Sequence, residues 1–439
     1  MNEVKNLKKE KNMLHRLLFD EKANITKRTY TWNLISSLLF SVQSAVFLLV
    51  AKRVSGETDA GVFIILFTVA QTLTSLGNYN IRDYQVSDIH EEYKFSTYYT
   101  ARLLTESVML VAALGYAFIK KLDVSGVVVL MCLVGYRFVE GVEDCYHGVV
   151  HRKGRFDVTS ICMSLRIIIS STVFIAVYII TKDQVTASVL LLVSSIAVYL
   201  VTIRVIKAEY PELKIAFSFD GVVRLLTVCF PIFIGAFLYS YLINAPKYAI
   251  DSLMPKNVQT VYNILFMPIF VVNILSMFIY KPIIVKLSNL WDEGDTKGFF
   301  AQMIKQCVLI AVLDMVIVAG GFVIGLKLLG IIYAAELSEY MGIFCLLLMF
   351  GGVTAMGYYL NVLITIMRKQ FYILIGYGAA FAVSLLTTRR LVSTYGIGGA
   401  AYAYGVIACA IMLIYLIAIC FETGRRKKND GAKKRVNKT

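Results

Sequence analysis

The sequence predicts an all-α membrane protein with about twelve transmembrane helices. Of its 439 residues, 58% are hydrophobic and 17% are charged, whereas a soluble domain carries about 25% charged residues. Its apolar runs approach the ~20 residues that a helix needs to cross a bilayer. They are too long for the strands of a membrane barrel, and barrel-type alternation is absent. A polytopic helical protein is therefore the fold class that we expect.

The apolar runs divide into two sets of six. In chain order, the predicted spans are 30–51, 58–78, 99–119, 124–148, 157–180, 185–206, 224–246, 258–281, 304–328, 338–366, 370–388 and 395–422. We predict one six-helix bundle over 30–206 and a second over 224–422, joined by a linker at 207–223. Basic segments flank them at 1–29 and 423–439.

Lysine and arginine define the expected orientation. With both termini in the cytoplasm, 32 of the 44 basic residues lie on the cytoplasmic side and 10 on the outer side. This asymmetry follows the positive-inside rule. The basic ends also explain the net charge of +15 through contact with anionic lipids, so no nucleic-acid partner is needed. The polar, basic N-terminus argues against a cleavable signal peptide.

Two cytoplasmic segments are expected to lie at the membrane surface. Residues 6–19 alternate lysines with apolar residues, which predicts an amphipathic helix. Residues 78–99 are polar and aromatic and follow the second span. The outer connections are all short, so no large external loop is available for a catalytic domain.

Enzyme and metal signatures are missing from the sequence. There is no phosphate-binding loop, HExxH, GxSxG or dinucleotide fingerprint. The eight cysteines lie in apolar segments without paired spacing, and they are interpreted as small core residues. We therefore predict a non-enzymatic protein without a cofactor or a bound metal.

The most unusual stretch is 135–151, a charged stripe within an apolar run. Six residues fall within about 120° of one helical face: Arg137, Glu140, Glu143, Asp144, His147 and His151. A charge facing lipid at the bilayer centre costs at least about 2.5–3.5 kcal/mol, so this face must border protein or water. We expect it to line a polar passage.

Other polar residues could share that passage. Arg166 lies roughly 14 Å and Arg137 roughly 18 Å from the cytoplasmic side at 1.5 Å per residue. Asn244 and Lys247 follow one another near Pro246, where a helix would kink or end. Arginine and lysine suit phosphate oxygens, but pairing of each arginine with an acid, or snorkelling of Lys247, would explain them equally well.

The acidic residues within the predicted spans also allow more than one interpretation. Glu140, Glu143 and Asp144 lie in the cytoplasmic half of their span, where they could form a gate. Glu106 and Asp314, alone in their spans, could bind a coupling H⁺ or Na⁺, or simply hydrogen-bond to a neighbour.

A weak internal repeat connects the halves. The segment 62–67 (VFIILF) is similar to 261–266 (VYNILF), at an offset of 199 residues. An even number of spans between copies predicts a parallel repeat about an axis along the membrane normal.

Several stretches resemble the polysaccharide-transport branch of the MOP flippase superfamily, the Wzx-type exporters. They are the segments 56–61 (GETDAG), 81–88 (IRDYQVSD), 144–158, 244–248 and 395–401. Drug-extruding MATE transporters share that fold, but no pattern here favours them. The resemblance implies two six-helix bundles and a flippase that moves undecaprenyl-diphosphate-linked sugar repeat units to the outer leaflet of the bacterial plasma membrane.

The resemblance also implies roles for individual residues. Arg137, Arg166 and Lys247, with Asn244 nearby and Arg82 at the mouth, would hold the diphosphate in a central cavity. Three carboxylates beside Arg137 depart from a uniformly cationic cavity. The implied partners are the lipid-linked substrate, membrane lipids and the polymerase and glycosyltransferases of the same pathway. The main alternative is an ion-coupled efflux transporter for small molecules.

Overall fold

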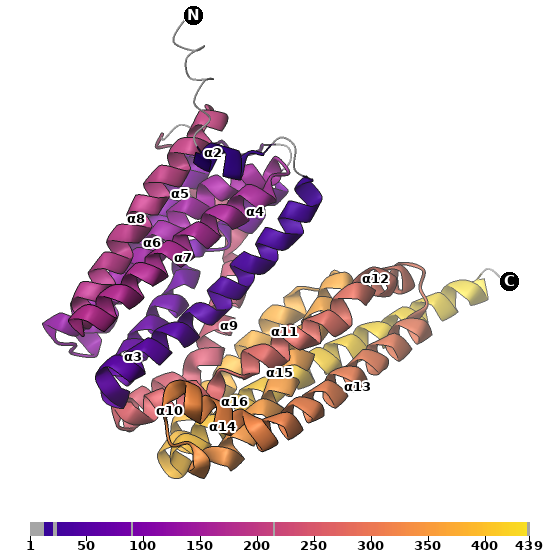
Figure 1. The fold of residues 1–439 in the computed structure, drawn as a ribbon. Coiled ribbons are helices and arrows are strands. Elements are labelled where there is room, and N and C mark those ends of the chain that lie inside the picture. The colour runs from indigo at the N-terminus through magenta and orange to yellow at the C-terminus, as the bar shows by residue number, and fades with distance from the viewer. Residues whose placement is uncertain (1–12, 21–23, 89–90, 214–215, 437–439) are drawn as a thin grey trace, which may run out of the picture. The chain divides into compact units, whose positions relative to one another are not determined.

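The computed structural model describes residues 13–20, 24–88, 91–213 and 216–436. All of its regular elements in these ranges are helical (Figure 1). Within the described part of the chain, ten helical segments are long and apolar enough to cross a membrane. Two of these, Ile25–Asn78 and Phe371–Arg426, have 54 and 56 residues, about twice the length that one crossing requires. Twelve crossings and cytoplasmic termini remain predictions.

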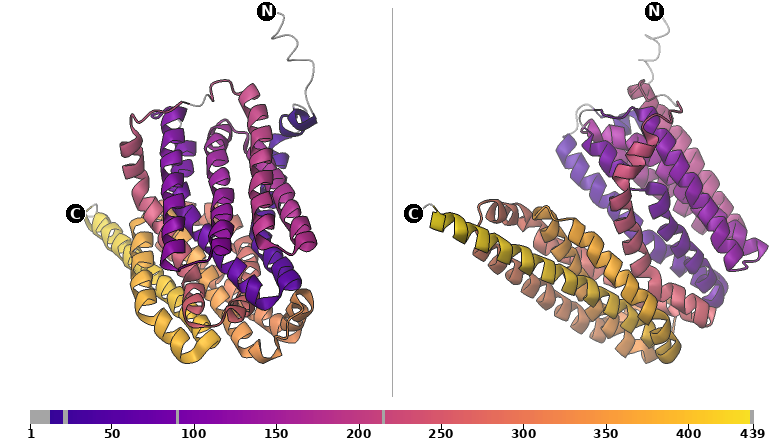
Figure 2. Two further views of the ribbon diagram at one scale, coloured as in Figure 1. Left: turned by 90° about the vertical axis from the view of Figure 1, so that its left-hand side faces the viewer. Right: turned by 180° about the vertical axis from the view of Figure 1, so that it is seen from behind.

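The chain forms two compact units. Unit 1 comprises residues 1–56 and 62–237, and unit 2 comprises 57–61 and 238–439. The predicted division into two six-helix bundles with a linker at 207–223 stays a prediction. Within each unit, long helices lie side by side (Figure 2).

Unit 1 is built from α2 to α8 and the first part of α9. The bounds are α2 (Met13–Leu18), α3 (Ile25–Asn78), α4 (Ile81–Ser87), α5 (Phe95–Ile119), α6 (Val124–Arg152), α7 (Phe156–Thr181), α8 (Gln184–Glu209) and α9 (Val222–Leu253). Helix α3 breaks at Gly56, whose φ of 84° and ψ of −176° are not helical. Glycine adopts positive φ readily, so this break matches the predicted turn between the first two spans.

Unit 2 contains the rest of α9 and the later helices. They are α10 (Lys256–Phe266), α11 (Ile269–Tyr280), η1 (Lys281–Ile283), α12 (Ile284–Asp292), α13 (Thr296–Gly320), the π-helical turn η2 (Gly321–Gly325), α14 (Leu326–Tyr333), η3 (Ser338–Tyr340), α15 (Met341–Ile366) and α16 (Phe371–Val436). The last helix breaks at Gly396, where φ is 58°. The sequence predicts that a helix kinks or ends near Pro246; an end there is wrong, because α9 continues to Leu253, and a kink stays a prediction.

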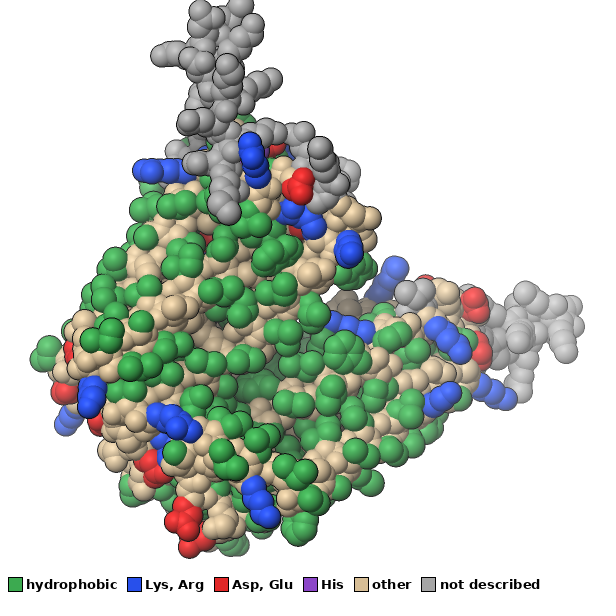
Figure 3. Space-filling model, in the orientation of Figure 1, with side chains coloured by type: hydrophobic (Ala, Val, Ile, Leu, Met, Phe, Trp, Pro, Cys, Tyr) green, Lys and Arg blue, Asp and Glu red, His purple; other side chains and the backbone are tan. Residues whose placement is uncertain are grey.

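Hydrophobic side chains cover most of the visible surface, and charged side chains gather near helix ends (Figure 3). Many large apolar residues are exposed on the outside of single helices, such as Phe118, Ile180 and Met315. In a soluble protein this would be a liability, whereas in a bilayer such residues meet lipid.

The segments predicted to be cytoplasmic meet at one end of unit 1. Arg152 donates a hydrogen bond to the carbonyl oxygen of Asp88 over 3.0 Å, and Thr97 donates one to that of Asp220 over 3.2 Å. The N-terminal helix α2 joins them, with Leu18 fully buried. Residues 6–12 of the predicted amphipathic helix lie outside the described residues.

Candidate functional site

A polar cavity of about 340 Å³ lies at this same end of unit 1. Residues from α3, α5, α6, α7 and the segment around α4 form its wall. They are Asn33, Ser36, Ser37, Phe40, Asn78, Asn80, Arg82, Asp83, Arg102, Glu140, Glu143, Asp144, His147, Phe156, Thr159, Ser160, Met163 and Arg166. The wall contains three arginines and four carboxylates.

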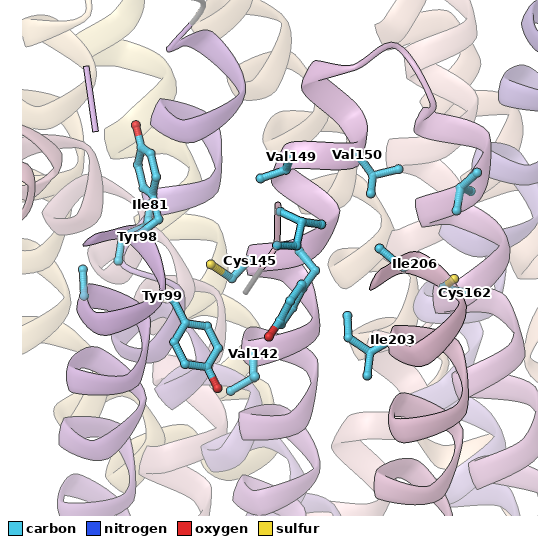
Figure 4. Close-up of a cluster of buried hydrophobic side chains, with 14 of the residues drawn as sticks. Ile81, Tyr98, Tyr99, Val142, Cys145, Val149, Val150, Cys162, Ile203 and Ile206 are labelled. Atoms are coloured by element: carbon cyan, nitrogen blue, oxygen red, sulfur yellow. The ribbon is translucent and has the colours of Figure 1, made fainter. Parts of the chain in front are cut away.

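Four of the six residues of the charged stripe of α6 face this cavity. Glu140, Glu143, Asp144 and His147 all line it. The opposite side of α6, including Val142 and Val149, packs into an apolar core with side chains of α5, α7 and α8 (Figure 4). The amphipathic pattern of α6 therefore orients the helix: one side completes the core and the other carries the charges to the cavity.

Arg137 and Arg166 are paired with acids of the stripe. Arg137 Nη1 lies 2.8 Å from Glu140 Oε2, and Arg166 Nη2 lies 3.3 Å from the same oxygen. Arg166 Nε donates to Glu143 Oε2 over 2.7 Å. Two guanidinium groups thus face two carboxylates, and this network carries no net charge. The pairing that the sequence left open as the alternative to anion binding is present for both arginines.

Arg137 itself lies outside the lining of the cavity. Its guanidinium carbon is 5.3 Å from the ring centres of Phe40 and Phe67, and only 3% of its side chain is exposed. Cation–π contacts of this kind stabilise a desolvated cation. The position of Arg137 indicates that it is a structural partner of Glu140.

A second network has more positive than negative charge. Asp144 forms ion pairs with both Arg82 and Arg102, the latter over 3.1 Å. Arg102 also donates to the backbone oxygens of Gly77 and Asn78, over 3.3 and 2.7 Å. Two guanidinium groups share one carboxylate, so one positive charge is left over. Asp83 is nearby but solvent-exposed, and it accepts a hydrogen bond from Asn80 over 3.1 Å.

Sequence reasoning missed one residue that lines this cavity and one that lies behind it. Arg102, in the cavity wall, is fully buried. Gln85, also fully buried, donates to the carbonyl oxygen of Cys145 over 3.1 Å and holds α4 against α6. A glutamine within a polar segment gives no sequence signal of burial. Arg102 and Glu106, at positions i and i+4, could have indicated a buried charge on α5.

The remaining predicted residues lie elsewhere. Lys247 and Asn244 belong to α9 in unit 2, and the Lys247 ammonium is 4.8 Å from the ring centre of Phe266. Asn244 donates to the Ser240 carbonyl oxygen within its own helix over 3.0 Å. Glu106 on α5 and Asp314 on α13 are buried beside glycines of neighbouring helices. Within the described part of the chain, no group of three or more histidine, cysteine or acidic side chains could hold a metal ion.

Asp88 organises the connection between α4 and α5. Its carboxylate accepts hydrogen bonds from Glu92 N, Tyr93 N and Tyr98 Oη over 2.8, 3.2 and 2.8 Å. Burial would raise the pKa of Asp88, but these hydrogen bonds outweigh burial and hold the pKa below its usual value. The ionised carboxylate therefore stabilises this end of the cavity.

We expect Asp88→Ala to lower the free energy of unfolding by about 1–3 kcal/mol at neutral pH, because three donors lose their acceptor. The folded-state pKa is lowered, so this contribution is present above pH ~4, the unfolded-state value, and is lost as the pH falls through the folded-state value. Melting temperatures of the wild type and the variant should converge in acid. Replacement of the exposed Glu336 by alanine is the control, and a pH-independent difference would contradict the role of the charge.

Comparisons with known proteins identify the fold. The sequence matches no model of a protein family, and it matches no curated protein. Solved structures do match. The lipid II flippase MurJ, in an inward closed conformation, has a TM-score of 0.70 at 12% identity, over 89% of this chain and 87% of that one.

Two MATE transporters are also similar. An inward-facing multidrug resistance transporter of the MOP superfamily gives a TM-score of 0.63 at 13% identity, covering 90% of this chain and 96% of the other. A Vibrio cholerae MATE transporter gives 0.57 at 13% identity, over 90% and 97%. With its apolar helices, the chain is a multi-pass membrane protein that has the fold shared by MATE transporters of the MOP superfamily and the lipid II flippase MurJ.

Proposed function

We propose that this protein is a flippase for lipid-linked oligosaccharides, which it moves by alternating access from the inner to the outer leaflet of a bacterial plasma membrane. The observation that carries the proposal is the excess positive charge of Arg82 and Arg102 around Asp144 in a polar cavity. The similarity in fold to a lipid II flippase supports it. The pathway's glycosyltransferases and polymerase would supply and consume the substrate.

The charges suit a diphosphate bearing an undecaprenyl chain. Arginine offers planar, paired donors that match phosphate oxygens. The side chain of Arg82 is 27% exposed, so a ligand can reach it, whereas that of Arg102 is fully buried and its Nε atom has no hydrogen-bond partner among the described residues. We therefore assign the diphosphate first to Arg82, with Arg102 behind it as the second cation and Arg166 at the cavity wall, and assign Arg137 mainly to pairing with Glu140.

The physical task matches the fold. A diphosphate and its sugars cannot enter hydrocarbon, whereas a prenyl tail can remain in lipid. A polar lumen between helices can shield the head group while the protein alternates between states that open to either side. No bond needs to be made or broken.

A second candidate is an ion-coupled exporter of small cations. The four carboxylates that line the same cavity favour it, as does the fold of the MATE transporters. The two functions predict opposite ligands. The two arginines that share Asp144 favour an anion, whereas four carboxylates against three arginines over the whole wall favour a cation.

Transport by proteoliposomes that contain the purified protein distinguishes the candidates. We expect translocation of a fluorescent undecaprenyl-diphosphate-linked disaccharide, competition by soluble pyrophosphate, and no accumulation of ethidium, a cationic dye. Arg82→Ala should slow translocation at least tenfold. The matched control is Arg224→Ala, because Arg224 lies at the same end of unit 1, is 74% exposed and pairs with Glu92. Ethidium uptake without lipid translocation would overturn the flippase and support the exporter.

A further inference from the structure

Glu106 is a buried carboxyl group that neither cavity network uses. It lies on α5 and is 1% exposed, and neither of its carboxyl oxygens has a hydrogen-bond partner among the residues that the structure describes. An isolated ionised carboxylate in such a place is strongly destabilising, because it loses its hydration without gaining a partner. In practice such a group takes up a proton instead.

Two glycines create the space for this carboxyl group. A Cβ atom on Gly141 of α6 would lie 1.7 Å from Glu106 Oε1, and one on Gly77 of α3 would lie 2.6 Å from Oε2. Any larger residue at either position would displace the carboxyl group. The group therefore packs directly against the backbone of two neighbouring helices.

The charges that act on Glu106 are one cation, Arg102, and two carboxylates, Glu140 and Asp144. Arg102, one turn earlier on α5, directs its guanidinium to Gly77, Asn78 and Asp144. The facing helix α6 contributes Glu140 and Asp144, which repel a negative charge. On α4, Arg82 is engaged with Asp144. The uncharged form of Glu106 is the one that these surroundings fit.

Unit 2 repeats this arrangement at the corresponding place. Asp314 is the acid of α13, is 9% exposed, and its Oδ1 atom has no hydrogen-bond partner within the described ranges. A Cβ atom on Gly352 of α15 would lie 2.2 Å from its carboxyl group. As in unit 1, the next long helix along the chain supplies the glycine.

Among the residues that the structure describes, no charge faces Asp314 from the helices that pack on α13. Neither α11 nor α15 contains a charged residue, and the turn η2 contains none. Helix α12 carries Lys286 and Asp292 but packs near Phe299, far along α13, where Trp291 contacts that ring. The part of α16 near α13 contributes Met412 and Leu416.

We propose that Glu106 and Asp314 are equivalent proton-binding sites, one in each unit, and that release of the proton drives the carboxylate away from its glycine and loosens the two helices. On release, the O–H bond breaks and the proton passes to water. A sodium ion fits less well, since it needs several oxygen ligands, and Gly77 O already accepts hydrogen bonds from Arg102 and Thr105. The inference goes beyond the proposed substrate and does not depend on it.

Infrared difference spectroscopy on the purified protein in lipid nanodiscs tests this without any substrate. At neutral pH we expect a carbonyl band from protonated carboxyl groups that shifts in D₂O and disappears in alkali. Glu106→Gln and Asp314→Asn should each remove about half of that band, and the double variant should remove it entirely. Asp83→Asn, at an exposed carboxylate on α4, is the control and should leave it unchanged. A band that survives in the double variant, or none at neutral pH, would overturn the proposal.

A glycine variant tests the packing part separately. Gly141→Ala should displace the Glu106 carboxyl group, so that its part of the band shifts and its proton is released at lower pH. Gly115→Ala is the matched control, because nothing lies within 4 Å of a Cβ atom at this glycine of the same unit. A Gly141→Ala spectrum identical to that of the wild type would refute the glycine contact. Transport by Glu106→Gln should lose its response to an imposed pH gradient even if the substrate proves to be a cation.

Discussion

Replacing Arg166 with methionine is expected to lower the free energy of unfolding by about 3–5 kcal/mol, because it removes one partner of a buried ion pair. The Arg166 side chain is 1% exposed and bonds to both Glu140 and Glu143. Without it, two carboxylates remain with Arg137 alone. A large fall in melting temperature in detergent, with loss of folded protein, should therefore accompany any loss of transport.

The control for this variant is Arg224→Met, at an exposed arginine. Adding Glu143→Gln to Arg166→Met should recover part of the lost stability, since it removes the carboxylate that has no partner. An unchanged melting temperature would show that Arg166 does not stabilise the fold. Ligand binding would then be its remaining role. Because of this expected effect, Arg82 is the better residue for testing diphosphate binding.

Asp144→Asn should have the opposite electrostatic consequence. It leaves Arg82 and the fully buried Arg102 without their shared carboxylate, so we expect a loss of about 3–5 kcal/mol in the absence of anions. Added pyrophosphate should restore stability by replacing the missing negative charge, by about 2.7 kcal/mol at a hundred times its Kd. The rise in melting temperature with pyrophosphate should exceed that of the wild type.

Asp83→Asn is the matched control, since Asp83 lines the same cavity but is exposed. It should neither destabilise the protein nor gain a response to pyrophosphate. If pyrophosphate leaves the melting temperature of Asp144→Asn unchanged, the two arginines do not form an anion site, and the proposed flippase loses its main support.

The helices could be predicted from the sequence because hydrocarbon imposes a minimum length on each apolar run. The positions at which helices break were harder to predict from the sequence. Gly56 lies in the predicted turn between two spans, but Pro246 does not end α9, because proline can be tolerated within a transmembrane helix when neighbouring groups satisfy the freed carbonyl. The π-helical turn at Gly321–Gly325 left no signal that we recognised.

The helical periodicity of charged residues predicted only part of the site. The stripe on α6 correctly indicated which face borders a cavity, since a 3.6-residue period fixes direction around a helix. It could not indicate which charges meet across helices. The partners of Arg166 and Arg102 depend on how α5, α6 and α7 pack, and that packing is set by the apolar core on the other side of α6.

The proposed repeat receives indirect support from burial. Residues 63–67 and 261–266 are at most 7% exposed. The last residue of each segment, Phe67 or Phe266, presents its ring to a buried cation, Arg137 or Lys247. The repeat itself and the role of Lys247 stay predictions.

The docking of helix α2 has a consequence for the order of biosynthesis. Arg155 donates to the carbonyl oxygen of Leu18 over 3.1 Å, the ring centres of Phe19 and Tyr210 lie 6.0 Å apart, and His15 lies 3.3 Å from Glu209. Since a chain is made from its N-terminus, the partners of α2 are made in sequence: Arg28 first, then Arg155, and Glu209 and Tyr210 last, about 190 residues after α2 itself. The contacts of α2 with the end of α8 can therefore form only after α8 has been made.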